Sequence, residues 1–193
     1  NIEEQEYINL KNEISSVTTD IIDIVDGDEK FPVLMGSILP SLKSNHCFIN
    51  NQAYEFSGNY TQGFSDIKMV TKNACSFLNA PYLWGGNTYL GIDCSGLIQV
   101  SLLLCGIDCP GDSDQQMNTL GHNLDIGSPR KKGDILFWKG HVAWAVNEKQ
   151  ILHANAYHMA TVIEEANEAI ERIKKQDKNS VIAHKRLKGE LYE

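Results

Sequence analysis

The sequence lacks any apolar run long enough to cross a bilayer, and it has little positive charge. With 17 Lys and Arg residues against 25 Asp and Glu residues, the 193-residue chain carries a formal charge of −8. Nucleic acids and anionic membranes bind net basic surfaces, so this balance argues against both and favours a neutral or cationic small partner. We therefore expect no nucleic-acid binding and no membrane insertion.

Paired metal-ligating cysteines are also missing. The five cysteines form no Cys-x-x-Cys pair, and helix breakers separate Cys105 from Cys109. We expect no metal, no cofactor and mostly reduced cysteines, which favours the cytoplasm. The start, NIEEQEYINL, lacks the basic-then-apolar order of a secretory signal. Because the chain does not begin with Met, a removed signal would instead place the protein in the periplasm or outside the cell.

What is present is enough apolar sequence, 42% of the chain, for a medium domain alone or with a small one. Between Glu13 and Tyr60 the pattern predicts several short strands and hence a small barrel: SVTTDIIDIV, a pair around Gly36 and a pair around an Asn-Asn turn. Pro32 and Pro40 are expected at edges or strand ends. A helical stripe begins after Ser65, its expected cap, and ends before Pro81, which indicates a second domain.

The stretch around Cys94 joins a loop to a helix. Aromatic residues and glycines precede Cys94, and an apolar run from Leu97 to Leu104 follows it. Asp93 or Ser95 can cap the helix, and Gly96 would leave room for a substrate beside the sulfur. A helix N-terminus favours a thiolate, so Cys94 is predicted to have a lowered pKa and to act as a nucleophile. The alternative is a small buried cysteine, and the local pattern alone leaves both open.

The second half of the chain is predicted to contain three β-segments, 134–138, 141–146 and 150–155. The polar stretches CPGDSDQQ and LGHNLDIGSP before them are expected to be loops. A helix over 162–173 and a final edge strand, VIAHKRL, should follow.

Two histidines fit the roles that a thiol nucleophile requires, a base and a residue that orients it. A hairpin of 141–146 with 150–155 would pair positions whose numbers sum to about 296, which places His153 opposite Ala143 and one diagonal step from His141. A one-residue slip would put the two rings on opposite faces. Each histidine taken singly could instead be structural. Of the other histidines, His158 is expected closest to the site.

A series of motifs follows in order along the second part of the chain: Tyr82-Leu-Trp84-Gly85-Gly86, Gly91-Ile-Asp93-Cys94-Ser95-Gly96-Leu97, Pro110-Gly-Asp112-Ser113 with Gln116, Gly133-Asp134-Ile-Leu-Phe137, Gly140-His141-Val142-Ala143 and Leu152-His153-Ala154-Asn155. In order and spacing, over residues 65 to 187, these motifs resemble the NlpC/p60 family of bacterial cell-wall cysteine peptidases. The resemblance implies an α+β fold: a papain-like catalytic domain, 63–193, after a small all-β SH3-like barrel, 1–62, that lacks part of its N-terminal side.

By the same resemblance, Cys94 would be the nucleophile, His141 the general base and His153 the residue that orients it. Tyr82 would help the backbone N–H of Cys94 to hold an oxyanion. The remaining predicted substrate-binding or cleft-lining residues are Asp93, Ser95, Trp84, Asp112 and Ser113. The family often has arginine where this chain has Gly111, which removes a possible substrate contact.

The resemblance implies hydrolysis of the bond between γ-linked D-glutamate and a diamino acid in peptidoglycan stem peptides. Two-domain members tend to act on free fragments that begin with L-alanine, which makes L-Ala-γ-D-Glu-diamino acid the expected partner. Two alternatives remain: an amidase or acyltransferase on the same scaffold, and a non-catalytic module that binds muropeptides.

Overall fold

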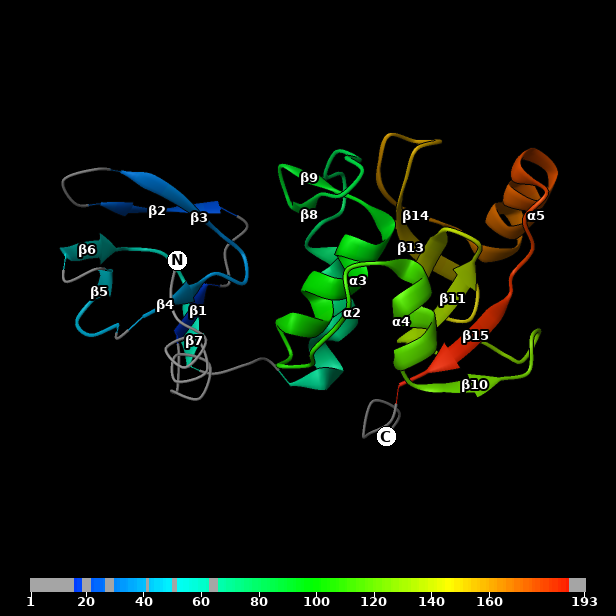
Figure 1. Ribbon diagram of the computed structural model, residues 1–193, viewed down its shortest axis with the longest axis horizontal. Coiled ribbons are helices and arrows are strands. Elements are labelled where there is room, and N and C mark those ends of the chain that lie inside the picture. Colours follow the sequence, from blue (N-terminus) through cyan, green and yellow to red (C-terminus); the bar gives the residue numbers. More distant parts are fainter. Residues whose placement is uncertain are drawn as a thin grey trace. The chain divides into compact units, whose positions relative to one another are not determined.

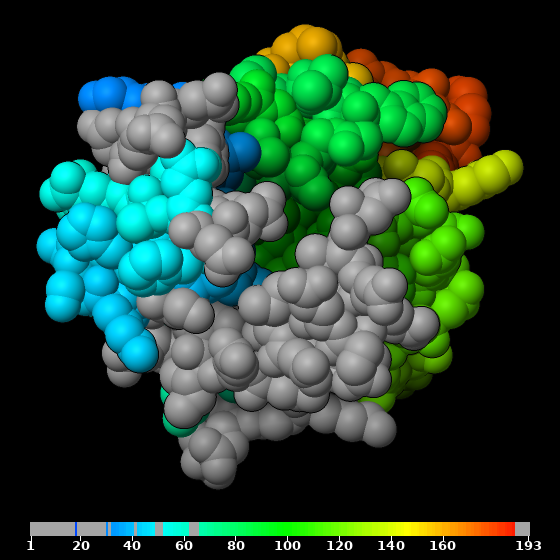
Figure 2. Space-filling model, turned by 60° about the vertical axis from the view of Figure 1, so that its left-hand side comes forward, coloured from blue at the N-terminus to red at the C-terminus, as the bar shows by residue number. Residues whose placement is uncertain are grey.

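The computed structural model describes residues 16–18, 22–26, 30–40, 42–49, 52–62 and 66–187. The chain divides into two compact units, 1–65 and 66–193, which are treated separately below (Figure 1). Figure 2 shows part of the surface of each unit, with β5 and β6 in cyan and the region of β8 and β9 in green. The expected cap Ser65 and the expected Asn50–Asn51 turn lie outside the described residues.

The described part of the first unit consists of short antiparallel strands in two sheets, ordered β4-β1-β7 and β3-β2-β6-β5. Pro32 lies in β3, an edge strand, as predicted. Leu39, Cys47 and Phe56 form a small buried core. The strands are β1 (Ser16–Thr18), β2 (Ile22–Asp26), β3 (Phe31–Leu34), β4 (Ile38–Leu39), β5 (His46–Ile49), β6 (Gln52–Phe56) and β7 (Tyr60–Gln62).

The second unit combines helices with a six-stranded antiparallel sheet of order β10-β15-β11-β12-β13-β14. This mixture confirms the predicted α+β class. The elements are the 3₁₀-helix η1 (Ile67–Met69), α2 (Val70–Cys75), β8 (Asn87–Thr88), β9 (Gly91–Ile92), α3 (Cys94–Leu103), α4 (Ser113–Thr119), β10 (His122–Leu124), β11 (Asp134–Trp138), β12 (His141–Ala145), β13 (Gln150–Asn155), β14 (Ala160–Glu165), α5 (Ala166–Asp177) and β15 (Ala183–Arg186).

The helices α3 and α5 lie on opposite sides of this sheet (Figure 1). Helix α3 packs against α2, β12 and β13, and the indole N–H of Trp144 donates to the hydroxyl of Ser101 across that interface at 3.0 Å. Residues of α5 pack with alternate residues of β11, β12 and β13 on the other side, including Leu136 and Ala143. Because α3 is apolar on nearly all sides, burial between α2 and the sheet stabilises it.

Three predictions about elements of the second unit are wrong: the two polar stretches expected to be loops, and the final strand expected at an edge. The stretches expected to be loops contain the helix α4 and the strand β10. The final strand β15 is not an edge strand, because β10 pairs along its other side. Accordingly Lys185 in β15 is buried, and its ammonium donates to the carbonyl of Leu120 at 3.0 Å. The cap of the first helical segment is Asp66, whose carboxylate accepts from the N–H of Lys68.

The predicted helix over 162–173 is also corrected, because its first four residues belong to β14. That strand pairs with β13 on one side, and on the other the N–H of Asn79 and the N–H of Tyr82 donate to the carbonyls of Thr161 and Met159. Backbone groups bonded on both sides favour the strand over the helical spacing of the apolar residues. Helix α5 begins only at Ala166, where the Glu165 carboxylate accepts from the N–H of Glu168.

Candidate active site

Cys94 is the first residue of α3, and Asp93 caps that helix. The Asp93 carboxylate accepts from the N–H of Gly96 at 2.7 Å, from the N–H of Gly85 at 2.8 Å and from the hydroxyl of Ser95 at 3.1 Å. These bonds fix the turn that presents the sulfur. The substrate-binding roles predicted for Asp93 and Ser95 stay predictions, because the described bonds of Asp93 are all to this turn.

Gly96 has a different role from the one expected. Its Cα lies so close to the backbone of Gly86 that a Cβ would overlap the carbonyl oxygen of Gly86. The glycine therefore lets the Gly85–Gly86 loop approach the first turn of α3. It does not open space for a substrate.

The segment from Pro81 to Ile92 places Tyr82 next to the cysteine. The N–H of Tyr82 bonds to Met159, and the N–H of Leu83 donates to the carbonyl of Ile92, two residues before Cys94. Tyr82 is half-buried, and burial raises the pKa of its hydroxyl, with the nearby Cys94 and Asp93 adding to the rise. The hydroxyl therefore remains a hydrogen-bond donor at neutral pH.

The two predicted histidines lie together on the sheet. The β12–β13 register pairs Trp144 with Leu152 and Ala145 with Ile151, which confirms the predicted sum of 296. The Nε2 atom of His141 lies 2.8 Å from the Nδ1 atom of His153, and the ring centroids are 5.1 Å apart. The one-residue slip that would have separated the rings is excluded.

The cysteine approaches this pair through the backbone of β12. The backbone N–H groups of Val142, the residue after His141, of Ser95 and of Cys94 itself lie near enough to the Cys94 sulfur to favour its thiolate form and work to lower its pKa. The sulfur therefore lies near the beginning of β12, whose first residue is His141. Tyr82, His141 and His153 line one cleft of about 630 Å³, together with residues of α5 and of the loop after β13.

The structure adds two residues that the sequence analysis missed. Glu164 of β14 lies with its Oε1 atom 2.6 Å from Nε2 of His153, and Arg172 of α5 donates from Nη2 to the same oxygen at 2.6 Å. The Arg172 guanidinium lies 4.2 Å from the centre of the Tyr157 ring. His158 is 3.6 Å from Glu164, as expected for the histidine nearest the site. The β-branched run Thr161-Val162-Ile163 was the signal that could have placed Glu164 on a strand.

The charge states at the site differ from those predicted. Burial raises the pKa of the Cys94 thiol to about 11, and the Asp93 carboxylate adds to the rise against the backbone N–H groups. Burial likewise lowers the pKa of His141 to about 3, with His153 and Arg172 contributing. The prediction of a lowered cysteine pKa is therefore wrong: desolvation outweighs the helix N-terminus, and thiol and imidazole are both neutral at rest.

Three predicted substrate-binding residues, Trp84, Asp112 and Ser113, are not among the residues that line the cleft next to His141, and their roles stay predictions. Trp84 is 87% exposed. Asp112 is exposed and Ser113 half-buried, at the start of α4, and neither lines the cleft next to His141. The buried residue of that motif is Gln116, whose amide donates to the carbonyls of Ser95 and Pro110 and so holds α4 against the first turn of α3.

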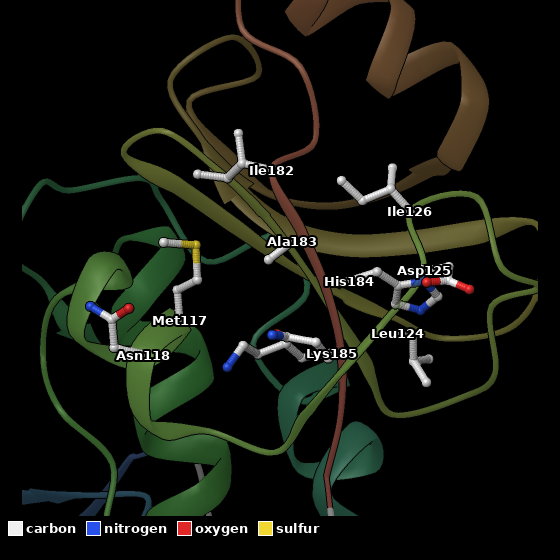
Figure 3. Close-up of a pocket in the computed structure, with 10 residues that line it drawn as sticks. Met117, Asn118, Leu124, Asp125, Ile126, Ile182, Ala183, His184 and Lys185 are labelled. Carbon is white, nitrogen blue, oxygen red and sulfur yellow. The ribbon is translucent and has the colours of Figure 1, made fainter.

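A second cavity, of about 540 Å³, lies elsewhere on this unit (Figure 3). Met117 and Asn118 of α4, the segment after β10 and the strand β15 with His184 and Lys185 surround it. None of the residues predicted from sequence to form the site lines this cavity. The cleft beside His141 is therefore the candidate active site.

A cysteine at a helix N-terminus, next to a bonded histidine pair on an antiparallel sheet, is the arrangement of a cysteine peptidase domain. Residues 79–179, just over half of the chain, match the model of the NlpC/P60 family, and the chain belongs to that family. The family predicted from sequence is confirmed.

Named relatives match a little under half of the chain. "Dipeptidyl-peptidase 6" of Lysinibacillus sphaericus is 37% identical over 86 residues, 45% of this chain and 31% of that protein. "Gamma-D-glutamyl-L-lysine dipeptidyl-peptidase" of Bacillus subtilis (strain 168) is 35% identical over 94 residues, 44% of this chain and 31% of that protein. The matched region spans less than a third of the length of either relative.

A solved structure extends the similarity over both units. An NlpC/P60 family protein from Bacillus cereus ATCC 10987 covers 95% of this chain, and 66% of its own chain is covered, with a TM-score of 0.77 and 22% identity. At that identity the comparison shows a shared fold. Among the described residues of our chain, no helix is long and apolar enough to cross a membrane.

Proposed function

We propose that this chain hydrolyses the γ-D-glutamyl–diamino acid bond of peptidoglycan stem peptides, with Cys94 as nucleophile. The observation that carries the proposal is that the Cys94 sulfur lies near the backbone N–H of Val142, the residue that follows His141, and that His141 is bonded to His153. The similarity to a gamma-D-glutamyl-L-lysine dipeptidyl-peptidase supports the bond, and the similarity to a second dipeptidyl-peptidase supports a peptide substrate.

In this mechanism the Cys94 sulfur attacks the γ-carbonyl carbon of D-glutamate while its proton passes to His141. The carbonyl electron pair moves to oxygen, and the tetrahedral intermediate collapses when His141 returns the proton to the amine of the diamino acid. The free amine leaves and a thioester remains. A water molecule, deprotonated by His141, then attacks the thioester and releases the γ-D-glutamyl product, with the thiol restored.

Burial keeps the Cys94 thiol protonated and the His141 imidazole neutral at rest, because it raises the pKa of the thiol to about 11 and lowers the pKa of His141 to about 3. In the proposed mechanism the proton therefore leaves the sulfur only as the sulfur attacks the carbonyl carbon. The oxyanion would be held by the backbone N–H of Cys94 and the hydroxyl of Tyr82, whose raised pKa keeps it protonated.

We further propose that the first unit is an SH3-like barrel and that the substrate is a free fragment with N-terminal L-alanine. The short antiparallel strands around Leu39, Cys47 and Phe56 support the barrel. Because all five cysteines are free, we propose that the protein is located in a reducing compartment, the cytoplasm.

The purified chain incubated with L-Ala-γ-D-Glu-diaminopimelate tests the proposal. We expect release of free diaminopimelate and L-Ala-D-Glu, identified by mass spectrometry. Transfer of the glutamyl group to an added amine without hydrolysis would indicate an acyltransferase instead. Binding without any turnover would indicate a muropeptide-binding module and would overturn the proposed peptidase.

A further inference from the structure

The side of His153 away from His141 is occupied by a carboxylate. Nε2 of His153 lies 2.6 Å from Oε1 of Glu164, and the His153 side chain is completely buried while that of Glu164 is 16% exposed. The two residues are diagonal neighbours on adjacent strands, because His153 pairs with Val162 and Ile151 pairs with Glu164. The contact is therefore fixed by the sheet register.

Glu164 is in turn held from the helix side. Arg172 of α5 donates from Nη2 to Oε1 of Glu164 at 2.6 Å, and its guanidinium lies over the ring of Tyr157. An oxygen that accepts from a guanidinium has no proton of its own to give. Oε1 must therefore act as an acceptor toward His153 as well.

This acceptor determines the positions of the protons on both rings. A neutral imidazole carries one proton, so a His153 that donates from Nε2 has a bare Nδ1. That bare Nδ1 lies 2.8 Å from Nε2 of His141, so His141 must donate from Nε2. The lone pair of His141 is then on Nδ1, the ring nitrogen that is not bonded to His153 and is available to take the thiol proton of Cys94.

We propose that Glu164, held by Arg172, is a positioning residue that fixes the tautomers of His153 and His141 so that Nδ1 of His141 is the catalytic base. The other ionisable group that faces Glu164 is His158, whose Nδ1 is 3.6 Å from Oε1 and 3.1 Å from Oδ1 of Asn155. Burial works to raise the pKa of Glu164, but the bonds from His153 and Arg172 outweigh it and hold it at about 2. The carboxylate is thus ionised at neutral pH.

The catalytic consequence rests on the proposed function, whereas the tautomers can be measured without a substrate. The first experiment is long-range ¹H–¹⁵N correlation NMR of the ¹⁵N-histidine-labelled full chain at pH 7. We expect both His141 and His153 to carry their proton on Nε2. A proton on Nδ1 of either ring would overturn the proposal, regardless of any activity.

The second experiment uses Glu164→Gln, whose amide can either accept from His153 or donate to it. We expect the two rings to show mixed tautomers and kcat for L-Ala-γ-D-Glu-diaminopimelate to fall by at least about 10-fold, with KM within about 3-fold, since loss of a general base costs roughly 10²–10⁴-fold. The matched control is Glu171→Gln, an exposed carboxylate next to Arg172 in sequence, which should leave tautomers and kcat unchanged.

The outcomes separate the two proposals. If Glu164→Gln keeps the tautomers and kcat of the original chain, Glu164 has no positioning role. If the unsubstituted chain releases no diaminopimelate, the proposed function is wrong. The NMR spectrum of that same chain still shows which tautomers His141 and His153 adopt. His184, which bonds through Nε2 to Asp134 at 2.9 Å, serves as an internal reference that Glu164→Gln should not change.

Discussion

Individual residues at this site differ from their sequence-based expectations mainly where burial decides the outcome. A helix N-terminus can lower a cysteine pKa, and Cys94 does begin α3 under an aspartate cap. However, the sequence does not reveal how much solvent the fold removes from the sulfur, or that the cap is itself an anion beside it. Both effects raise the pKa, and together they outweigh the helix.

This difference predicts how Cys94 reacts with iodoacetamide. Because only the thiolate is alkylated and the pKa is about 11, the rate at Cys94 should rise about tenfold per pH unit from pH 6 to pH 9. Peptide mapping by mass spectrometry separates Cys94 from the other four cysteines. A rate that is already constant above pH 7 would contradict the neutral thiol.

The contact between Gly86 and Gly96 predicts a second effect at the residue scale. Gly96→Ala should lower the free energy of unfolding by about 2 kcal/mol or more, because its methyl group overlaps backbone that cannot move aside. Urea titration followed by tryptophan fluorescence measures it, since all three tryptophans lie after residue 65. Gly111→Ala is the control: its Cβ would meet only the Gln99 amide at 3.9 Å, so a loss equal to that of Gly96→Ala would refute the explanation.

At the scale of elements, the sequence predicts best where a local pattern and a turn coincide. The hairpin of β12 and β13 was predicted in its correct register, because its strands alternate and a four-residue connection joins them. The strand β14 was missed because Ile163, Ala166, Ile170 and Ile173 continue at helical spacing across the strand–helix boundary. Glu164 was missed for the same reason, because a residue on the predicted helix would not have been expected to face His153.

Helix α4 was missed for another reason. Gln116 is the buried residue of this seven-residue helix, so no apolar stripe indicated it. Its packing depends on amide bonds to carbonyls of Ser95 and Pro110, one of them far away in sequence. Contacts of that kind are formed by tertiary structure and leave no local pattern.

The pairing of β11 with β15 depends on a buried carboxylate, which gives a prediction at this scale. Asp134 accepts from Arg186 at 2.7 and 2.8 Å and lies 2.9 Å from Nε2 of His184. Burial opposes its ionised form, but these bonds dominate and lower its pKa. Asp134→Asn should therefore cost about 3 kcal/mol at pH 7, because a neutral amide replaces the carboxylate that accepts from Arg186.

The pH dependence of that loss has a defined sign. A carboxyl group whose pKa is lower in the folded chain stabilises it above the unfolded value of about 3.9, and that contribution is lost as the pH falls. The difference between the original chain and Asp134→Asn should shrink below about pH 4 in urea titrations. The exposed Asp125→Asn is the control. A difference that stays constant from pH 7 to pH 3 would contradict the assignment.

At the scale of the whole molecule, every residue of the candidate site belongs to the unit 66–193. Asp66 itself belongs to this unit, since its carbonyl lies 3.4 Å from the sulfur of Cys105. The sequence indicated a boundary between the two units, because the pattern of short strands there gives way to apolar residues at helical spacing. The domain limits of 1–62 and 63–193 and the SH3-like assignment stay predictions.

We predict that a chain beginning at Asp66 folds without the first unit. Its sheet, α3 and α5 enclose their own buried core, so urea should unfold it in one cooperative transition. Circular dichroism and tryptophan fluorescence should report the same midpoint. A shortened chain that shows no cooperative transition would mean that the first unit is required for folding.

The central claim is that Cys94 performs the chemistry next to His141, and one measurement tests it most directly. Cleavage of L-Ala-γ-D-Glu-diaminopimelate should be compared between the original chain, Cys94→Ala and the control Cys105→Ala. We expect Cys94→Ala to lose at least about 10³-fold in kcat while it still binds the peptide, and Cys105→Ala to remain active. Undiminished release of diaminopimelate by Cys94→Ala would contradict the account.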